Sequence, residues 1–295
     1  MEEVWMPLKN AIDLHIHIGP DTVQRYYDCI SLAKESLEKG MRAIILKDNP
    51  CSSVHKAILT NMIVPEINVF GGIVLNHTSG GLNIRSVLSA LKMGGKIIWL
   101  PTSDAEYSIK KGEKGHWIQK ITKRSSYGYK MEGITVLSKD KSIKKEVKDI
   151  LKIVNDYNAI LATGHISPTE CLAVIDANEN IGAKILVNHP NIWFDDFTNE
   201  ILNLYVKGKA TIEFTAGGIT ARHGQNDPEE IVSVINNIGY RNCCLSTDFG
   251  GIDQCSPSEG LRSFAYILND CGVSKEKIEY MIKQKPAELL GLSSI

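Results

Sequence analysis

Short apolar runs alternate with amphipathic segments along most of the chain, and this alternation restricts the fold more than any other feature. Each run is too short for a buried helix and is rich in β-branched residues, which is typical of strands. The expected strands lie at 11–18, 42–47, 68–75, 96–101, 159–164, 184–189, 210–215 and 243–248. Strands that alternate with helices are parallel and joined by right-handed crossovers. Eight such units over residues 1–295 predict an α/β protein, a single (β/α)8 TIM barrel domain.

An open, doubly wound sheet is the alternative architecture for the same alternation. It would need a glycine loop of the phosphate-binding type after an early strand, and the segment HIHIGPD is not one. The barrel is therefore the favoured fold.

Three helix starts share a capping residue, then proline, then glutamate three residues after the cap. They are Ser167-Pro-Thr-Glu170, Ser256-Pro-Ser-Glu259 and Asp227-Pro-Glu-Glu230.

The composition is that of an ordinary folded protein, with 43% hydrophobic and 23% charged residues. The net charge of −1 gives no reason to expect nucleic acid or a membrane surface as a partner. The acidic start MEEVWMPLKN is not a signal peptide, and no apolar stretch approaches the ~20 residues of a membrane span. Seven cysteines without a CxxC pair indicate reduced thiols. We therefore expect a cytoplasmic protein that acts on a small molecule.

Residues 105–141 interrupt the alternation after the fourth strand, and their first part has no clear strand or amphipathic helix. From 109 to 148 the chain has 12 Lys or Arg against 4 Asp or Glu, with Trp117, Tyr127 and Tyr129 among them. In a barrel, an enlarged loop here would lie over the C-terminal mouth, where active sites are found. Two interpretations remain open. The segment is a basic lid over an anionic substrate, or it is a solvated excursion or a contact between subunits of a homo-oligomer.

The first strand lies within AIDLHIHIGPD, which has two histidines two residues apart. Side chains two residues apart point to the same side of a strand. Asp13, His15 and His17 are therefore expected on one face. The other face is expected to carry the apolar residues Leu14, Ile16 and Ile18. Two imidazoles side by side at the end of a strand suit a metal ion.

Three further strands end in residues that bind metals in proteins. The segments are LATGHIS with His165, LVNHP with His189 and LSTDFGG with Asp248. The C-terminal ends of barrel strands converge on one mouth, so these residues meet the two histidines of the first strand. A single histidine is more often a packed residue, but the joint pattern predicts a divalent metal site. Zinc is favoured, with iron or manganese as alternatives.

With these residues in place, the chain resembles the amidohydrolase superfamily of metal-dependent hydrolases. The matching positions follow in order along the whole chain and are Asp13-Leu-His15-Ile-His17, His165, His189, Asp248 and the closing segment KQKPAELLGL (283–292). The resemblance implies that a metal ion is held by His15, His17, His165 and Asp248. It implies that His189 binds a second metal or polarises the substrate.

The chain departs from the superfamily at the fourth strand. Two-metal members have a carboxylated lysine or a glutamate there, whereas this strand offers Pro101, Thr102 and Asp104. Lys47, at the end of the second strand, is a candidate for a carbamate, for a contact to the substrate's charge, or for a salt bridge at the barrel rim. Glu213 on the seventh strand is expected as a core partner of a basic residue rather than as a further ligand. The number of metal ions, one or two, is therefore open.

The pattern predicts a hydrolase that cleaves an amide, lactam or ester bond of a small, anionic substrate. A zinc-type ion lowers the pKa of bound water from ~15.7 to ~7. Asp248 would take the proton and pass it to the leaving group, and His189 or the metal would stabilise the oxyanion. Asp13 is expected to orient or pack beneath the site. Asn76 and His77, after the third strand, are candidates for substrate contacts or are ordinary turn residues.

Two other functions fit the same residues less well. A single-metal decarboxylase of the same superfamily is favoured by the missing ligand on the fourth strand. A barrel that binds a metal or ligand without turnover has no need of both His189 and Asp248. A dinucleotide enzyme is disfavoured because no GxGxxG follows a strand. Carbon dioxide release from aromatic carboxylates, against ammonia or acid release from amides, lactams and esters, distinguishes decarboxylase from hydrolase.

Overall fold

The computed structural model describes residues 5–113, 132–194, 199–220 and 226–293. Within these ranges, eight parallel strands pair in chain order, from β1 to β8. They are β1 (Ile12–His17), β2 (Ala43–Lys47), β3 (Asn68–Val74), β4 (Ile97–Trp99), β5 (Ile160–Ala162), β6 (Lys184–Val187), β7 (Thr211–Thr215) and β8 (Cys243–Ser246). The predicted (β/α)8 barrel is confirmed, and each expected strand contains an observed one.

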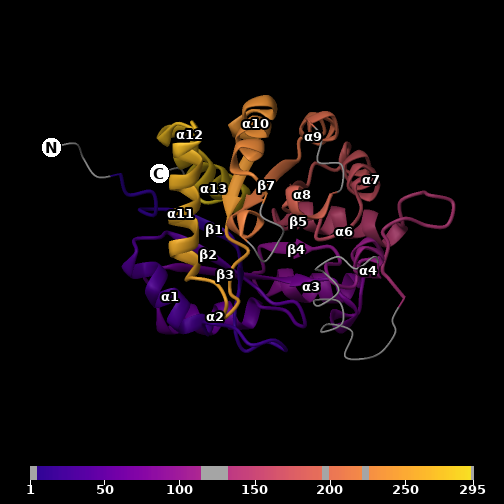
Figure 1. Ribbon diagram of the computed structural model, residues 1–295. Helices are drawn as coiled ribbons and strands as arrows, with labels where there is room; N and C mark the ends of the chain where they lie inside the picture. The colour runs from indigo at the N-terminus through magenta and orange to yellow at the C-terminus, as the bar shows by residue number, and fades with distance from the viewer. Residues whose placement is uncertain (1–4, 114–131, 195–198, 221–225, 294–295) are drawn as a thin grey trace.

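Helices surround the strands and alternate with them along the chain (Figure 1). They are α1 (Cys29–Glu38), α2 (Val54–Ile63), α3 (Ile84–Lys92), α4 (Glu106–Glu113), α6 (Lys145–Asp156), α7 (Pro168–Asn178), α8 (Pro190–Trp193), α9 (Asn199–Lys207), α10 (Pro228–Ile238), α11 (Pro257–Asp270), α12 (Lys275–Glu279) and α13 (Lys285–Leu290). Short 3₁₀ turns are η1 (His77–Ser79), η2 (Ala216–Ile219) and η4 (Tyr240–Asn242), and a π-helical turn, η5 (Tyr280–Gln284), joins α12 to α13. None of the helices in the described ranges has the length and apolarity needed to span a bilayer.

The predicted capping residues begin three of these helices. At α7, the Ser167 hydroxyl accepts the Glu170 amide at 3.3 Å, and the Glu170 carboxylate accepts the Ser167 amide at 2.9 Å. Ser256 and Asp227 likewise cap α11 and α10 by accepting backbone amides of the first turn. These bonds satisfy amides that the helix itself leaves unpaired.

The barrel closes between β1 and the segment that follows β8. The amide of Asp248 donates to the carbonyl of His15 at 2.8 Å, and the amide of His17 donates to the carbonyl of Phe249 at 2.7 Å. The first and last strands are therefore joined through the backbone of three predicted metal ligands.

The apolar core has an inner and an outer layer. Inside the barrel, the strand residues Ile45, Ile97 and Trp99 pack with Leu289 and Leu290 of α13. The predicted closing helix thus seals the end of the barrel opposite the histidines. The outer layer lies between the strands and the surrounding helices. The site is therefore built on a filled barrel and not over a pore.

A register shift between Asp13 and Ile16 interrupts β1. Leu14 packs inside the barrel, whereas Ile16 and Ile18 pack in the outer layer. The expectation that these three apolar residues share one face is therefore wrong. The irregularity breaks the strict alternation of the strand, as a β-bulge does, and such bulges are common beside active sites.

The segment 105–141 begins with a helix, α4, where the sequence suggested none. The Tyr107 hydroxyl donates to the carbonyl of Trp193 at 3.0 Å, and the Lys111 ammonium donates to the same carbonyl. Contacts with a distant segment, and not an apolar periodicity, hold this helix in place. The aromatic and most basic part of the predicted lid lies in 114–131, outside the described residues, so the lid stays a prediction.

Gly72 on β3 gives the fold a sharp test. A Cβ atom there would lie 2.0 Å from the Ile97 carbonyl oxygen and 2.7 Å from the Trp99 ring, so Gly72→Ala should lower the free energy of unfolding by about 3 kcal/mol. Gly94→Ala is the control, because its Cβ would meet nothing within 4 Å and only its φ of +95° opposes it, at about 1 kcal/mol. Urea unfolding followed by circular dichroism measures both. Equal decreases in the free energy of unfolding for the two variants would contradict the close packing of β3 against β4.

Candidate metal centre

Closure of the barrel brings two histidines and one carboxylate together. The Nε2 atoms of His15 and His17 lie 3.0 Å and 3.1 Å from the same oxygen, Oδ1 of Asp248. His15 is fully buried, and the other two side chains are about one-tenth exposed. The three groups form the side of the mouth where the first and last strands meet.

The ends of β5 and β6 add two more imidazoles. His189 Nε2 lies 3.9 Å from the second Asp248 oxygen, Oδ2, and the ring centroids of His165 and His189 are 5.3 Å apart. Both ring nitrogens of His189 and Nδ1 of His165 are buried and have no hydrogen-bond partner among the described residues. The Trp193 ring stacks on His165 at 3.7 Å and limits where that imidazole can point. The structure thus brings all five predicted ligands to one mouth.

Two of these residues have unusual backbone conformations. His189 has a φ of 25° and Asp248 a φ of 56°, in the left-handed region that non-glycine residues rarely occupy. Each lies two residues beyond the end of a strand and turns its side chain toward the mouth. Strain of this kind persists only where the surrounding structure holds it, and it is concentrated at functional sites.

Glu213 determines which nitrogen of His15 faces the mouth. Its Oε2 lies 3.1 Å from His15 Nδ1 and also accepts a hydrogen bond from Asn188 at 2.7 Å. The Ser246 hydroxyl donates to its other oxygen at 2.5 Å. A carboxylate accepts hydrogen bonds, so Nδ1 of His15 carries a proton toward Glu213, and Nε2 is the ring nitrogen that faces Asp248 and Lys47. The prediction that Glu213 is the core partner of a basic residue is confirmed.

Burial keeps three of the imidazoles neutral. It lowers the pKa of His189 to about 4, and it lowers the pKa of His165 well below the usual value. Burial and the neighbouring Arg25 guanidinium also lower the pKa of His17 well below the usual value. A neutral imidazole offers a lone pair, which metal binding requires. These histidines therefore need no deprotonation at neutral pH before they bind a cation.

The charged groups of the site favour a cation in their midst. Burial opposes ionisation of Asp248, but His15 and His17 hold its pKa well below the usual range. Burial and Lys47 oppose protonation of His15, yet Asp248 and Glu213 raise its pKa to about 9. Burial lowers the pKa of Lys47 to about 8. Two buried carboxylates thus draw positive charge toward His15.

The donor set fits a divalent metal ion. One ligand atom from each of His15, His189 and Asp248 lies within 4.8 Å of the others. Donors bound to tetrahedral zinc at ~2.0–2.1 Å are roughly 3.3 Å apart, close to the separations that join Asp248 to His15 and His17. The unpartnered nitrogens of His165 and His189 face the same mouth, and Zn²⁺ prefers such nitrogen and oxygen donors.

Asp13 lies beneath the centre, as predicted, and positions its neighbours. Its carboxylate accepts the amide of His15 at 3.0 Å and the hydroxyl of Thr247 at 2.5 Å. Burial raises its pKa to about 7, against the effect of these hydrogen bonds. The carboxylate thereby connects β1 to the end of β8, directly below the ligands.

Two cationic side chains and one aromatic ring stand beside the histidines. Lys47 Nζ lies 3.0 Å from His15 Nε2 and 5.8 Å from the centroid of the Trp99 ring. Arg25 Nη2 lies 3.3 Å from His17 Nδ1, and Asp21 binds the same guanidinium at 2.6 Å. Sequence reasoning missed Arg25 and Trp99. Each had one signal in the sequence. Arg25 lies four residues after Asp21, and Trp99 is the bulky residue of the short strand IIW.

The other candidate residues lie in loop networks around the mouth. Asn76 donates to the Thr102 hydroxyl and accepts the Thr102 amide, both at 2.9 Å. The His77 amide donates to Asp104 at 2.8 Å, and its Nε2 lies 2.8 Å from the Glu132 carbonyl. The structure does not group these residues with the five ligands. Their role in substrate binding, and that of Asp104 as a bridging ligand, remain predictions.

Eight parallel strands with histidines and an aspartate at their C-terminal ends form a (β/α)8 barrel, and several solved structures of hydrolases share this fold. Solved structures with this fold include an amidohydrolase from Pseudomonas aeruginosa, at 10% identity and a TM-score of 0.60, with 96% of this chain and 97% of that chain covered. A dihydroorotase matches at 13% identity and a TM-score of 0.59, covering 97% of this chain and 70% of that chain. N-acetyl-D-glucosamine-6-phosphate deacetylase from Mycobacterium smegmatis matches at 11% identity and a TM-score of 0.55. The match covers 97% of this chain and 78% of that chain. The predicted resemblance is confirmed for the fold.

The chain itself belongs to DUF6282, a family of unknown function, whose model matches residues 10–213. The match covers the segments that carry His15, His17, His165 and His189 and ends before Asp248. A search of the curated proteins by sequence finds no match.

The Glu213–His15 contact predicts a specific acid sensitivity of the metal-free protein. Burial opposes ionisation of Glu213, but His15 and Asn188 hold its pKa at about 2, against 4.5 in the unfolded chain. The stabilisation is therefore fully present above pH 4.5 and is lost as the pH falls toward 2. Glu213→Gln should lower the free energy of unfolding by about 3 kcal/mol at neutral pH, and this difference from wild type should shrink below pH 4.5.

Urea unfolding at a series of pH values, after removal of metal with a chelator, measures this difference. Glu66→Gln, at an exposed position before β3, is the control and should match wild type throughout. A Glu213→Gln deficit that does not change with pH would contradict an ionised Glu213.

Proposed function

We propose that the protein is a metal-dependent hydrolase that cleaves an amide, lactam or ester bond of a small, anionic substrate. The observation that supports this most strongly is the convergence of four histidines and Asp248 at the mouth of the barrel, with three of the imidazoles held neutral by burial. Solved structures with the same fold carry the names of hydrolases. The metal would be held by His15, His17, His165, His189 and Asp248, with zinc preferred over iron or manganese.

A bound divalent ion supplies an activated water whose pKa falls from ~15.7 toward ~7. Asp248 is ionised at neutral pH, so its carboxylate can accept the proton of the attacking water and pass it to the leaving group. His189 is neutral and has both ring nitrogens unpartnered among the described residues. Its alternative to binding the metal is to donate an N–H of its ring to the developing oxyanion. Glu213 keeps His15 in the tautomer that presents Nε2 to the mouth.

Positive charge beside the centre supports an anionic substrate. Lys47 is 2% exposed at the end of β2, and the Arg25 side chain is 8% exposed after β1. Both groups lie within 3.3 Å of a histidine of the centre. A carboxylate on the substrate would find an ammonium and a guanidinium there, and a guanidinium suits carboxylate geometry. A carbamate on Lys47 remains the alternative role for this residue.

A single-metal decarboxylase is the second candidate. Trp99 is fully buried at the end of β4, the strand from which two-metal members of the superfamily supply a bridging ligand. An indole ring is not a metal ligand, so this position favours a single ion. Decarboxylation needs only one ion to stabilise the carbanion-like charge.

Metal content tests the centre directly. Untagged protein purified without chelator should contain at least one equivalent of zinc, iron or manganese per chain by inductively coupled plasma mass spectrometry. His15→Ala and His189→Ala should lower this content to background, because each removes a ligand of the compact donor group. His55→Ala, which removes an exposed histidine on α2, is the matched control and should keep the metal. A wild-type protein that binds none of these ions even after reconstitution would overturn the proposal.

Product analysis with the metal-loaded protein then separates the two reactions. Amides, lactams and esters should release ammonia or acid, whereas aromatic carboxylates should release no carbon dioxide. Carbon dioxide release without hydrolysis would instead support the decarboxylase. A protein that binds metal but turns over neither set would be a non-catalytic barrel.

Lys47→Met tests the substrate's charge. The substitution keeps the length of the side chain and removes its ammonium, so KM for an anionic substrate should rise about 10- to 100-fold, equivalent to the loss of one charge-assisted hydrogen bond. The matched neutral substrate, with its carboxylate replaced by a carboxamide, should show little change in KM. Lys34→Met, at an exposed position on α1, is the control. An equal change in KM for both substrates would show that Lys47 does not recognise the substrate's charge.

We also propose that the protein works in the cytoplasm. All seven cysteines are free thiols, and several of them are buried in the core. Unpaired cysteines are typical of a reducing compartment.

A further inference from the structure

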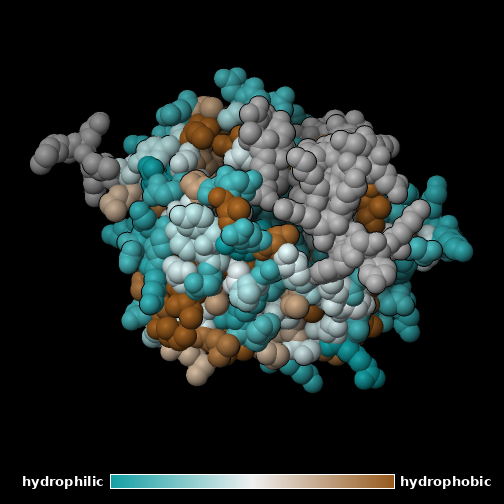
Figure 2. All heavy atoms as spheres, turned by 60° about the horizontal axis from the view of Figure 1, so that its bottom comes forward, coloured by the Kyte–Doolittle hydropathy of each residue, from teal (hydrophilic) through white to brown (hydrophobic). Residues whose placement is uncertain are grey.

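The helix α2 is apolar on both its inner and its outer side. Val54 and Ala57 are buried against the barrel. On the outer side, Ile58 is 41% exposed, Leu59 58%, Met62 75% and Ile63 55%. Figure 2, in which the lower side of Figure 1 has come forward, shows hydrophobic side chains gathered toward its lower left. The apolar side of a surface helix normally faces the core, whereas here a second apolar side faces outward.

The polar side chains of α2 other than His55 bind groups within the chain and do not make this outer face polar. Lys56 reaches back to Asp48 and to a backbone carbonyl before α1, and its side chain is 11% exposed. The Asn61 side chain binds both the amide and the carbonyl of Val69, at 3.0 Å and 2.7 Å. The Thr60 hydroxyl donates to the Lys56 carbonyl at 2.7 Å. Every polar side chain of α2 except the exposed His55 is thus engaged within the chain, and the outer face carries no lysine, arginine, aspartate or glutamate.

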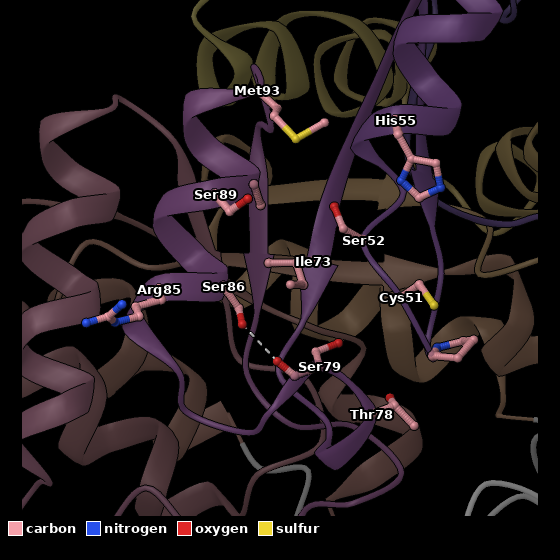
Figure 3. A pocket seen from close by; sticks show the side chains of 12 residues that line it. Cys51, Ser52, His55, Ile73, Thr78, Ser79, Arg85, Ser86, Ser89 and Met93 are labelled. Carbon is pink, nitrogen blue, oxygen red and sulfur yellow. Dashed lines mark hydrogen bonds between the residues drawn. The ribbon is translucent and has the colours of Figure 1, made fainter.

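A hollow lined mostly by uncharged residues, together with Arg85 and His55, lies beside this helix. Its volume is about 500 Å³, and it opens between the start of α2 and the length of α3 (Figure 3). Ser52 and Ser86 line it, and their hydroxyls already donate to the carbonyls of Gly72 and Ser79. Met93, 47% exposed at the end of α3, adds an apolar side chain to the lining. In Figure 3 the Arg85 guanidinium points away from the other labelled side chains.

We propose that this face is the contact of a two-fold dimer, in which α2 of each copy packs into the hollow of the other. An isologous contact uses the same patch on both copies, so one chain must supply both the protruding part and the recess. This face supplies both: α2 protrudes with Ile58, Leu59 and Met62, and the hollow lies next to it.

The size and charge of the patch favour a second copy as the occupant. Five apolar side chains on α2 and at the end of α3 are between 41% and 75% exposed, and monomeric proteins rarely expose contiguous apolar patches of more than a few hundred Å². These side chains would form the apolar centre of the ~800 Å² that each partner buries in an interface of standard size. The outer face of α2 carries no lysine or arginine with which to attract nucleic acid or an anionic membrane.

Sedimentation of the full chain tests the dimer, independently of metal content and activity. Wild type should sediment at twice the 32.6 kDa of the chain. A double variant, Leu59→Glu with Met62→Glu, should raise the dissociation constant of the dimer at least a hundredfold, because it places two charges on each copy of an apolar contact. Leu204→Glu, at a position 46% exposed on α9, is the matched control and should remain dimeric. A monomeric wild type at every concentration, or an unchanged dissociation constant in the double variant, would overturn the proposal.

Met93→Glu separates the packing of α2 into the hollow from a simpler contact between two α2 helices. Its side chain lies at the hollow and not on α2, so it should also weaken the dimer, by at least tenfold. If the dissociation constant of the Met93→Glu dimer equals that of wild type, the packing of α2 into the hollow is contradicted. Circular dichroism and the urea midpoint check that each variant is folded. If Leu59→Glu with Met62→Glu fails this check, Met62→Ser replaces it, with an expected weakening of at least tenfold.

Discussion

Closure of the barrel between β1 and the end of β8 is the constraint on which the site depends. Two backbone hydrogen bonds place Asp248 beside His15 and His17, although His17 and Asp248 are 231 residues apart in the chain. Because the backbone makes these bonds, the short carboxylate of Asp248 needs little reach to lie near both ring nitrogens. Asp13 strengthens the same junction from below through Thr247. A sheet that stayed open would separate the first ligands from the last.

Electrostatics at this junction explain why a cation belongs there. Glu213 and Asp248 are ionised in a buried site, and buried charges are costly unless they are paired. His15 and Lys47 compensate this charge at neutral pH, whereas burial keeps His189 neutral. A divalent ion among the ring nitrogens and Asp248 would take the place of the proton on His15 Nε2, because metal binding releases protons from its ligands.

Local patterns predicted most of the fold, and the exceptions depend on distant contacts. The eight strands and the caps at Ser167, Ser256 and Asp227 follow from the residues in each segment. The helix α4 has no such signal, because its anchors bind the carbonyl of Trp193. The shift in β1 is likewise invisible in the residues themselves, because it arises from pairing with β2. Asn76 illustrates the reverse problem, since the sequence could not show that its polar groups join two loops, and its contact with a substrate stays a prediction.

By itself, the sequence determined the barrel and the identity and order of the five candidate ligands, because strand periodicity and strand-end position are local properties. Only the tertiary structure decided what stands beside them. It placed Arg25 next to His17, Lys47 next to His15, and Trp99 at the end of β4. It also left the outer side of α2 uncovered. These outcomes depend on how eight strands stagger and how their loops pack, and such distances arise only when residues far apart in the chain come together.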